Sequence, residues 1–493
     1  MRWTAIVLLC VLWLTRLLSL EVLPLHNDEG LHLTRAVEVW NGHPFWAISD
    51  GKIINHWLIA AFYPQGAPVF AGRVATIFLG LIGLAAGYAL ARRLAGSTGA
   101  LLAGALWLFS PYLFFYERLA FSDAQAGALV MLAVWLAFRL SESGQRREAV
   151  LTGLALGAAL LFKFTAAPFV LSVALVVLLK GQVPRQRRWL NLVIIAGVVA
   201  AGFVVPLGYL LLKGNDLFAI AFGWLGTSSG QGIAFFNNLQ RLWAQLTGFG
   251  TISWVVLLIG GLALLLLRKT RSNPVGRLSD GQLAVIVWAL PLLVIMILGR
   301  EVLSRHYVVA LPLALTLGGA GLGLGVQRFK LAPARNLVVA AGIVALVFGF
   351  VPLALTAYTN PAALPLPADV RYEHITSHSS GYGLREAAQQ FPTTLTRPDL
   401  PIIGSLFPDS CRRANFYAPA NFKMVCTDAP GLPEIEAALR DNGAVYVLAD
   451  NAPLIGVDVR TLDSQVTCIA AYPRPGETEA DASVVLWLVE PRS

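Results

Sequence analysis

The chain has 493 residues, of which 56% are hydrophobic and 13% charged, whereas a soluble domain has about 25% charged residues. This composition excludes a single water-soluble core, because lipid must solvate much of the sequence. Residues 1–356 hold 27 Lys and Arg against 12 Asp and Glu, and residues 357–493 hold 10 against 16. The apolar part therefore carries +15 and the remainder −6. Basic residues in a membrane part mostly set orientation, so no nucleic-acid partner is expected.

Stretches long enough to cross a bilayer, about 20 apolar residues each, recur through the first 356 residues. The fold class predicted from them is a polytopic α-helical membrane protein. The segment 150–180 contains a central Lys163 and forms either two short helices or one long tilted helix. Taking it as two gives eleven spans, near residues 4–20, 69–91, 99–115, 124–140, 150–163, 164–180, 190–212, 248–267, 283–299, 307–325 and 336–356.

The basic residues indicate which side of the membrane each loop occupies. With eleven spans and a cytoplasmic N-terminus, one side collects 17 Lys and Arg, and the other side of the membrane part collects 10. The positive-inside rule places the richer side in the cytoplasm and the C-terminus outside. No small-x-small cleavage motif follows the first span, so we expect a retained signal anchor in the plasma or inner membrane.

The predicted first external loop, residues 21–68, carries an Asp-Glu pair directly after the first span. The residues that follow predict an amphipathic helix at the membrane interface. Asp28, near the start of this helix, is either a helix N-cap or a functional carboxylate. Later in the loop Lys52 precedes His56 by four residues, and Lys52 is either a snorkelling lysine or a functional cation.

Three further external segments bring ionisable residues to the ends of spans, where such groups are costly and more often functional than surface charges. The turn after the third span contains Glu117, Arg118 and Asp123, for which a local salt bridge with Arg118 is the structural alternative. Lys163 lies at the outer end of the 150–180 pair, and Arg305 lies in a charged cluster at 300–306. Carboxylates and cations on one face suit a carboxylate base that acts beside an anionic lipid headgroup. A transporter more often places such groups at mid-membrane.

These residues resemble motifs of the GT-C fold membrane glycosyltransferases, in particular the protein O-mannosyltransferase / lipid A aminoarabinose transferase superfamily. The resemblance covers residues 1 to 330 approximately, and it rests on the order and shared external placement of motifs that are individually weak. The matching segments are DEGLHLTRA with Asp28, GKIINHWL with Lys52, ERLAFSDA with Asp123, GLALGAALLFKFTAAP with Lys163, SRHYVVALPLAL with Arg305, and GYGLREAAQQF after the last span.

The resemblance implies a mechanism. Asp28 would be the catalytic aspartate, and Lys52, Lys163 and Arg305 would hold the donor phosphate, whose leaving group needs cations rather than a proton donor. The acceptor hydroxyl must lose a proton as it attacks, which makes Asp28 the general base, and direct attack inverts the anomeric carbon. The expected function is transfer of a sugar from a polyprenyl-phosphate donor to a protein, lipid or glycan acceptor outside the cytoplasm.

The sequence departs from the family within two motifs. Leu31 stands where the aminoarabinose transferases have an arginine, His32 replaces the usual tyrosine, and Ile53-Ile54 replaces Pro-Pro. The sugar is therefore not implied. The pattern requires no cofactor and allows a divalent metal. Residues expected to orient the acceptor or hold such a metal are Glu29, His32, His56, Glu117, Arg118 and Asp123.

Two other functions fit the spans and the charges at lipid depth. One is a lipid-linked sugar flippase or another transporter, which does not obviously need the Asp28 loop or a large external domain. The other is a polymerase or ligase of surface glycans.

Residues 357–493 are expected to form the external part, with a Pro-rich linker at 357–379 and a small α/β domain at 380–493. Its predicted helices are 380–391 and 432–443, and its predicted strands are 401–406, 444–450 and 483–490. The domain has no glycine-rich phosphate loop, so we expect a lid or an acceptor-docking module.

Histidines and cysteines in this part allow two further predictions. His374 and His378 lack a third ligand at suitable spacing, so a solvated polar segment is preferred over a metal pair. Cys411 and Cys426 are expected to form a disulfide in the external domain, and free thiols are the alternative.

Overall fold

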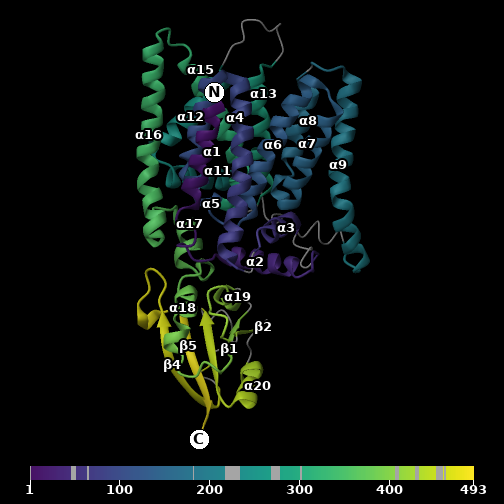
Figure 1. The fold of residues 1–493 in the computed structure, drawn as a ribbon. Coiled ribbons are helices and arrows are strands. Elements are labelled where there is room, and N and C mark those ends of the chain that lie inside the picture. The colour runs from purple at the N-terminus through teal and green to yellow at the C-terminus, as the bar shows by residue number, and fades with distance from the viewer. Residues whose placement is uncertain are drawn as a thin grey trace.

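The computed structural model describes residues 2–45, 51–63, 66–180, 182–216, 234–267, 278–299, 302–405, 410–422, 424–427, 432–450, 459 and 462–492. It shows a helical bundle with a small sheet domain at one end, opposite the N-terminus (Figure 1). The helices of the bundle and its loops are α1 (Arg2–Leu17), α2 (Asn27–Trp40), α3 (Ile53–Ala61), α4 (Pro68–Leu108), α5 (Pro111–Glu117), α6 (Ser122–Ser143), α7 (Arg146–Phe162), η2 (Phe164–Ala166), α8 (Phe169–Leu179), α9 (Arg185–Leu212), α11 (Phe235–Phe249), α12 (Ile252–Leu266), α13 (Asp280–Leu298), α14 (Ser304–Tyr307), α15 (Leu311–Val326) and α16 (Ala332–Thr359).

Within the described residues, five helices are long and apolar enough to cross a membrane, namely α4, α6, α9, α13 and α16. Shorter apolar helices are α1, α8, α12 and α15. The helices α9 and α16 flank the bundle and leave most of their apolar side chains exposed, as expected of helices that face lipid (Figure 1). Each of the eleven predicted spans overlaps a helix, and the count of eleven stays a prediction.

Helix α4 reverses direction in its middle. Gly96 has φ 70° and ψ −165°, a backbone conformation that favours glycine. A Cβ atom on Gly99 would lie 3.4 Å from the carbonyl oxygen of Ala91, whereas eight residues of straight helix span about 12 Å. The ring of Trp107 would likewise meet a Cβ on Gly83 at 3.0 Å. The two halves of α4 therefore lie antiparallel, as the separate predictions at 69–91 and 99–115 require.

The segment 150–180 forms two helices, α7 and α8, separated by the short turn η2. Lys163 is the C-cap of α7 and has an extended backbone, which ends the helix. The choice of two helices over one tilted helix is confirmed, and Lys163 lies in the break between them.

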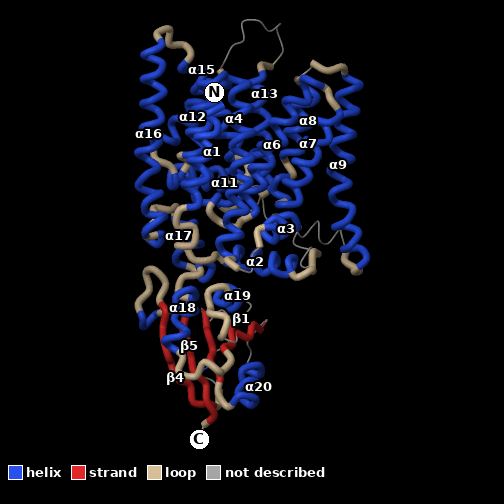
Figure 2. Tube along the Cα trace, in the orientation of Figure 1, coloured by secondary structure: helices blue, strands red, loops and turns tan. Residues whose placement is uncertain are grey.

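The sheet domain is a small α/β unit (Figure 2). Its strand order is β2-β1-β3-β5-β4, with β1 parallel to β2 and β3, and β5 antiparallel to β3 and β4. Tyr446 and Leu448 pack in the apolar core beside α18, and Val445 and Val447 pack on the opposite face beside α20. The elements are α18 (Leu384–Thr394), β1 (Ile402–Ser405), α19 (Ser410–Asn415), β2 (Met424–Thr427), α20 (Leu432–Asn442), β3 (Val445–Asp450), β4 (Ser464–Tyr472), η7 (Glu479–Asp481) and β5 (Val484–Pro491).

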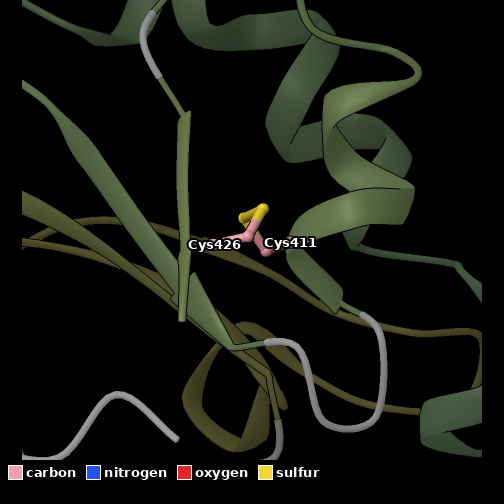
Figure 3. Close-up of a disulfide and its surroundings, with 2 residues drawn as sticks. All are labelled: Cys411 and Cys426. Carbon is pink, nitrogen blue, oxygen red and sulfur yellow. A yellow bond between two sulfur atoms is a disulfide. The ribbon is translucent and has the colours of Figure 1, made fainter. Parts of the chain in front are cut away.

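A disulfide joins Cys411 of α19 to Cys426 of β2, with an S–S distance of 2.05 Å (Figure 3). The predicted pairing is confirmed. Cys10 and Cys468 are free and exposed. The disulfide therefore fixes β2 to α19, and α19 in turn packs against α2 of the first loop.

The segment 357–379, expected as a linker, is folded against the bundle. After α16 come η3 (Pro361–Ala363), α17 (Ala368–Arg371), the π-helical turn η4 (Tyr372–Thr376) and η5 (His378–Ser380). The side chain of His374 is 1% exposed and packs among the rings of His26, Phe115 and Phe121. The expectation that it is solvated is wrong, because aromatic side chains at the outer end of the bundle enclose it.

Candidate active site

The start of α2 is fixed by His26 rather than by Asp28. His26 is the N-cap, and its Nδ1 accepts the backbone N–H of Asp28 at 3.1 Å. The Glu29 carboxylate accepts the backbone N–H of His26 at 3.1 Å, which completes a capping box. The N-cap interpretation of Asp28 is therefore wrong, and its carboxylate is available for other contacts.

The side chain of Asp28 forms an ion pair with Arg305, which lies 277 residues later in the sequence. Arg305 Nη1 lies 2.6 Å from Asp28 Oδ2 and 3.2 Å from Glu373 Oε1. Asp28, Arg305 and Glu373 are 29%, 16% and 20% exposed, so solvent or a ligand can reach all three. Burial alone would raise the pKa of Asp28, but the charges of Arg305 and Lys52 hold that pKa far below its usual range. Asp28 is therefore ionised at neutral pH.

Arg305 is held in place through the short helix α14. The Tyr112 hydroxyl donates to the carbonyl oxygen of Ser304, and the Tyr116 and Ser304 hydroxyls lie 2.5 Å apart. On the other side the Tyr307 hydroxyl donates to the carbonyl oxygen of Asn238 at 2.7 Å. Hydrogen bonds to residues of α5 and α11 therefore hold α14 in position.

Lys52 and two histidines line the neighbouring part of the first loop. Lys52 is the N-cap of α3, and its charge lowers the pKa of both Asp28 and His32. His32 Nδ1 and His56 Nε2 are 3.2 Å apart, and both rings are buried. Burial and the nearby cations lower the pKa of both histidines well below the usual value, so they stay neutral and one ring donates to the other.

A second ion pair completes the charged cluster. Lys163 Nζ lies 2.7 Å from the carboxylate of Asp123, which is in the first turn of α6. Among the predicted residues the structure thus forms two ion pairs, Asp28–Arg305 and Asp123–Lys163, and a contact between His32 and His56.

Three predicted site residues have structural partners. Both Glu29 oxygens accept from Arg73, at 2.9 and 2.8 Å. Glu117 accepts from Arg16 at 3.0 Å and from Trp107 at 2.9 Å.

Arg118 binds main chain rather than an acid. Its guanidinium donates to the carbonyl oxygens of Arg16, Leu18 and Ser19 at the end of α1. The local salt bridge with Arg118, given above as the structural alternative, does not form, since Glu117 pairs with Arg16 and Asp123 pairs with Lys163. These contacts connect helices to one another and do not place the three side chains with Asp28.

Sequence reasoning missed Glu373 and His26. Glu373 lay in a segment expected to be a linker, and nothing in its neighbourhood suggested a contact with a residue of the bundle. His26 did carry a signal, because a polar side chain at the start of an amphipathic helix is a candidate cap. The sequence also contains a signal for Arg16 and Arg73, since an arginine inside an apolar span requires a partner.

Among the described residues, His26, Glu373 and His374 have ligand atoms within 4.8 Å of one another. This donor set suits a zinc ion by type. However, His26 Nδ1 accepts the Asp28 N–H, so a neutral ring carries its proton on Nε2, which lies 3.4 Å from Glu373 Oε1. A protonated Nε2 cannot bind a metal. The tautomer of His26 that caps α2 therefore does not suit a metal site.

Comparisons with known proteins agree with this architecture. A family model of dolichyl-phosphate-mannose-protein mannosyltransferases matches residues 50–209, about a third of the chain. A search of curated proteins finds no match.

Two crystal structures of ArnT from Cupriavidus metallidurans share the fold. The form bound to undecaprenyl phosphate matches with a TM-score of 0.64 and 17% identity, over 98% of this chain and 97% of that chain. The apo form matches with a TM-score of 0.61 and 16% identity over the same shares. The archaeal oligosaccharyltransferase AglB from Archaeoglobus fulgidus, in complex with an inhibitory peptide and a dolichol-phosphate, gives a TM-score of 0.47 and 12% identity, over 92% of this chain and 70% of that chain. The chain therefore has the GT-C fold of the membrane glycosyltransferases, and the predicted resemblance to the protein O-mannosyltransferase / lipid A aminoarabinose transferase superfamily is confirmed.

Proposed function

We propose that this protein is an inverting glycosyltransferase that moves a sugar from a polyprenyl-phosphate donor to an acceptor hydroxyl at the extracytoplasmic face of the cell membrane. The observation that carries the proposal is the ionised, accessible carboxylate of Asp28 among the cations Arg305, Lys52 and Lys163. Asp28 belongs to α2 and Lys52 is the N-cap of α3, and these two helices lie at the end of the bundle nearest the sheet domain (Figure 1).

Each charged group has a distinct part in the proposed reaction. Asp28 accepts the hydroxyl proton while the acceptor oxygen bonds to the anomeric carbon, and the bond from that carbon to the phosphate oxygen breaks. The phosphate leaves as an anion, which Lys52, Lys163 and Arg305 stabilise in a partly dehydrated site. The donor phosphate also offers Arg305 a further anion besides Asp28 and Glu373, which weakens its hold on Asp28 and makes that carboxylate a stronger base. A free polyprenyl phosphate and an inverted glycoside are the products.

The family and fold comparisons support a lipid-linked donor. ArnT is described with undecaprenyl phosphate bound, and this chain shares its fold over nearly the full length. We extend that donor class to this protein because three cations converge beside one base. Asp123, His32 and His56 are left to position the acceptor or the sugar. The clustering of the charges at one end of the spans, rather than at their middle, favours transfer over transport.

The proposal is tested with purified protein, candidate polyprenyl-phosphate sugars identified by mass spectrometry of co-purified lipid, and two variants that should fail differently. Asp28→Asn keeps the shape of the side chain but cannot accept a proton, so transfer should fall about 100-fold or more with donor binding retained. Lys52→Ala should weaken donor binding by roughly 1.5–3 kcal/mol, because the phosphate loses a charged partner.

Since His26 caps α2, loss of transfer in Asp28→Asn cannot be attributed to a lost cap. Near-normal transfer by this variant at normal expression would contradict the proposal and favour a transporter. Lys330→Ala, at an exposed position between α15 and α16, serves as the control for removing a lysine.

A further inference from the structure

The segment between α16 and the sheet domain contributes a carboxylate to the candidate active site. Glu373 Oε1 lies 3.2 Å from Arg305 Nη1 and 3.4 Å from His26 Nε2. Arg305 in turn pairs with the side chain of Asp28, and His26 accepts the backbone N–H of Asp28. The four residues therefore close a ring of contacts that holds Asp28 by its carboxylate and by its main chain.

We propose that Glu373 is a positioning residue for the proposed transfer reaction, which orients Arg305 and His26 and through them Asp28. This inference rests on the proposed function. Glu373 touches neither the donor phosphate nor the acceptor in this scheme, and it acts only through its two partners. Of these the Arg305 contact is the stronger, because the His26 contact is longer and less well aligned.

The backbone around Glu373 is anchored firmly enough for this role. The next residue, His374, is buried against the rings of Phe115 and Phe121. On the C-terminal side, Arg413 of the sheet domain donates to the carbonyl oxygens of His378 and Ser379. The sheet domain thus supports the segment that carries Glu373, beyond the lid or docking role expected from the sequence.

The division of Arg305 between two carboxylates has a functional consequence. The group formed by Asp28, Arg305 and Glu373 has one negative charge in excess when both acids are ionised. The pKa of Glu373, which burial alone would raise, is held far below its usual range by His26, His374 and Arg305, so it is ionised at neutral pH. Without the negative charge of Glu373, Arg305 would pair with Asp28 only. The site would then repel an incoming phosphate less strongly.

Glu373→Gln separates positioning from a general structural role. We expect kcat to fall about tenfold or more, because Asp28 is misoriented and more tightly paired. The Kd for undecaprenyl phosphate, measured by native mass spectrometry, should be unchanged or lower. Glu373→Asp keeps the charge with a shorter reach, and we expect it to recover part of the lost kcat. Glu436→Gln, on the exposed side of α20, is the matched control and should behave as wild type.

Two outcomes would overturn the inference. If Glu373→Gln transfers as fast as wild type while Asp28→Asn is inactive, the inference fails and the proposed function stands. If kcat falls together with a raised Kd and a lowered melting temperature, Glu373 supports the fold and does not position the base. Normal transfer by Asp28→Asn would instead sink the proposed function itself.

Discussion

Asp28 and Glu29 show how differently two adjacent acids can be used. Successive residues of a helix point about 100° apart, so one faces the ion cluster and the other faces the interior of the bundle. Asp28 is accessible and pairs with Arg305, whereas Glu29 and Arg73 are both 0% exposed and form a bidentate pair. The sequence predicts Asp28 as the base from its place in a motif. It cannot separate the roles of the two acids, because that depends on which residue of a distant helix each one meets.

The two acids should therefore give opposite phenotypes. Glu29→Gln leaves the Arg73 guanidinium buried without a charged partner, which should destabilise the fold by about 3–5 kcal/mol. We expect low yield and a lowered melting temperature in detergent, because the single amide oxygen of the variant cannot accept from Arg73, His26 and Ala120 at once. Asp28→Asn is the matched control and should melt like wild type. A Glu29→Gln protein that is as stable as wild type would show that this pair contributes little.

At the scale of elements, apolar length predicts the spans well. Separate spans at 69–91 and 99–115 are predicted on either side of the turn at Gly96, and a break at Lys163 is one of two predicted alternatives, because polar or flexible residues interrupt long apolar runs there. Strands β2 and β4 were not predicted. Four residues are too few to show a period in β2, and β4 lies at an edge of the sheet where exposed and half-buried side chains do not alternate regularly. Their pairing is decided by neighbouring strands rather than by their own sequence.

The disulfide gives a prediction about these elements. Cys411→Ser with Cys426→Ser opens a loop of 15 residues, and the entropy of the longer unfolded chain should lower stability by about 3 kcal/mol. Thermal unfolding of the purified protein should show the loss, and reduction of the wild type should reproduce it. Cys468→Ser removes an exposed free thiol and should leave the melting temperature unchanged. Equal melting of the double variant and the wild type would contradict the assignment of a stabilising role.

For the whole molecule, composition and charge predict a bundle with an external α/β domain, and the structure has a bundle with such a domain at one end (Figure 2). The contacts between the two parts were not predictable. Leu25 donates its N–H to the Tyr417 hydroxyl at 2.8 Å, and Arg385 donates to the carbonyl oxygen of Val22. Such pairs join residues hundreds of positions apart, and no local period or motif marks them.

The orientation of the molecule is open to a direct test. The 17-to-10 asymmetry of basic residues predicts that a reporter fused after residue 493 is active outside the cytoplasm. A fusion after Lys330, between α15 and α16, is the matched control and should be active in the cytoplasm. Activity of the first fusion only in the cytoplasm would put the proposed site on the wrong face for a lipid-linked donor.

The ring that joins Asp28 to Glu373 also bears on how the protein is made. At about 5–20 residues per second, a ribosome needs roughly 17–70 s after adding Asp28 before it adds Glu373. The first loop carries its carboxylate and its lysine early in that interval, but Arg305 is added only 68 residues before Glu373. The nascent chain therefore waits in the membrane with an incomplete centre, and activity appears only once the last helix has been inserted and the segment behind it has folded back. A premature stop codon after α16 would give an inserted, inert protein rather than an unregulated transferase.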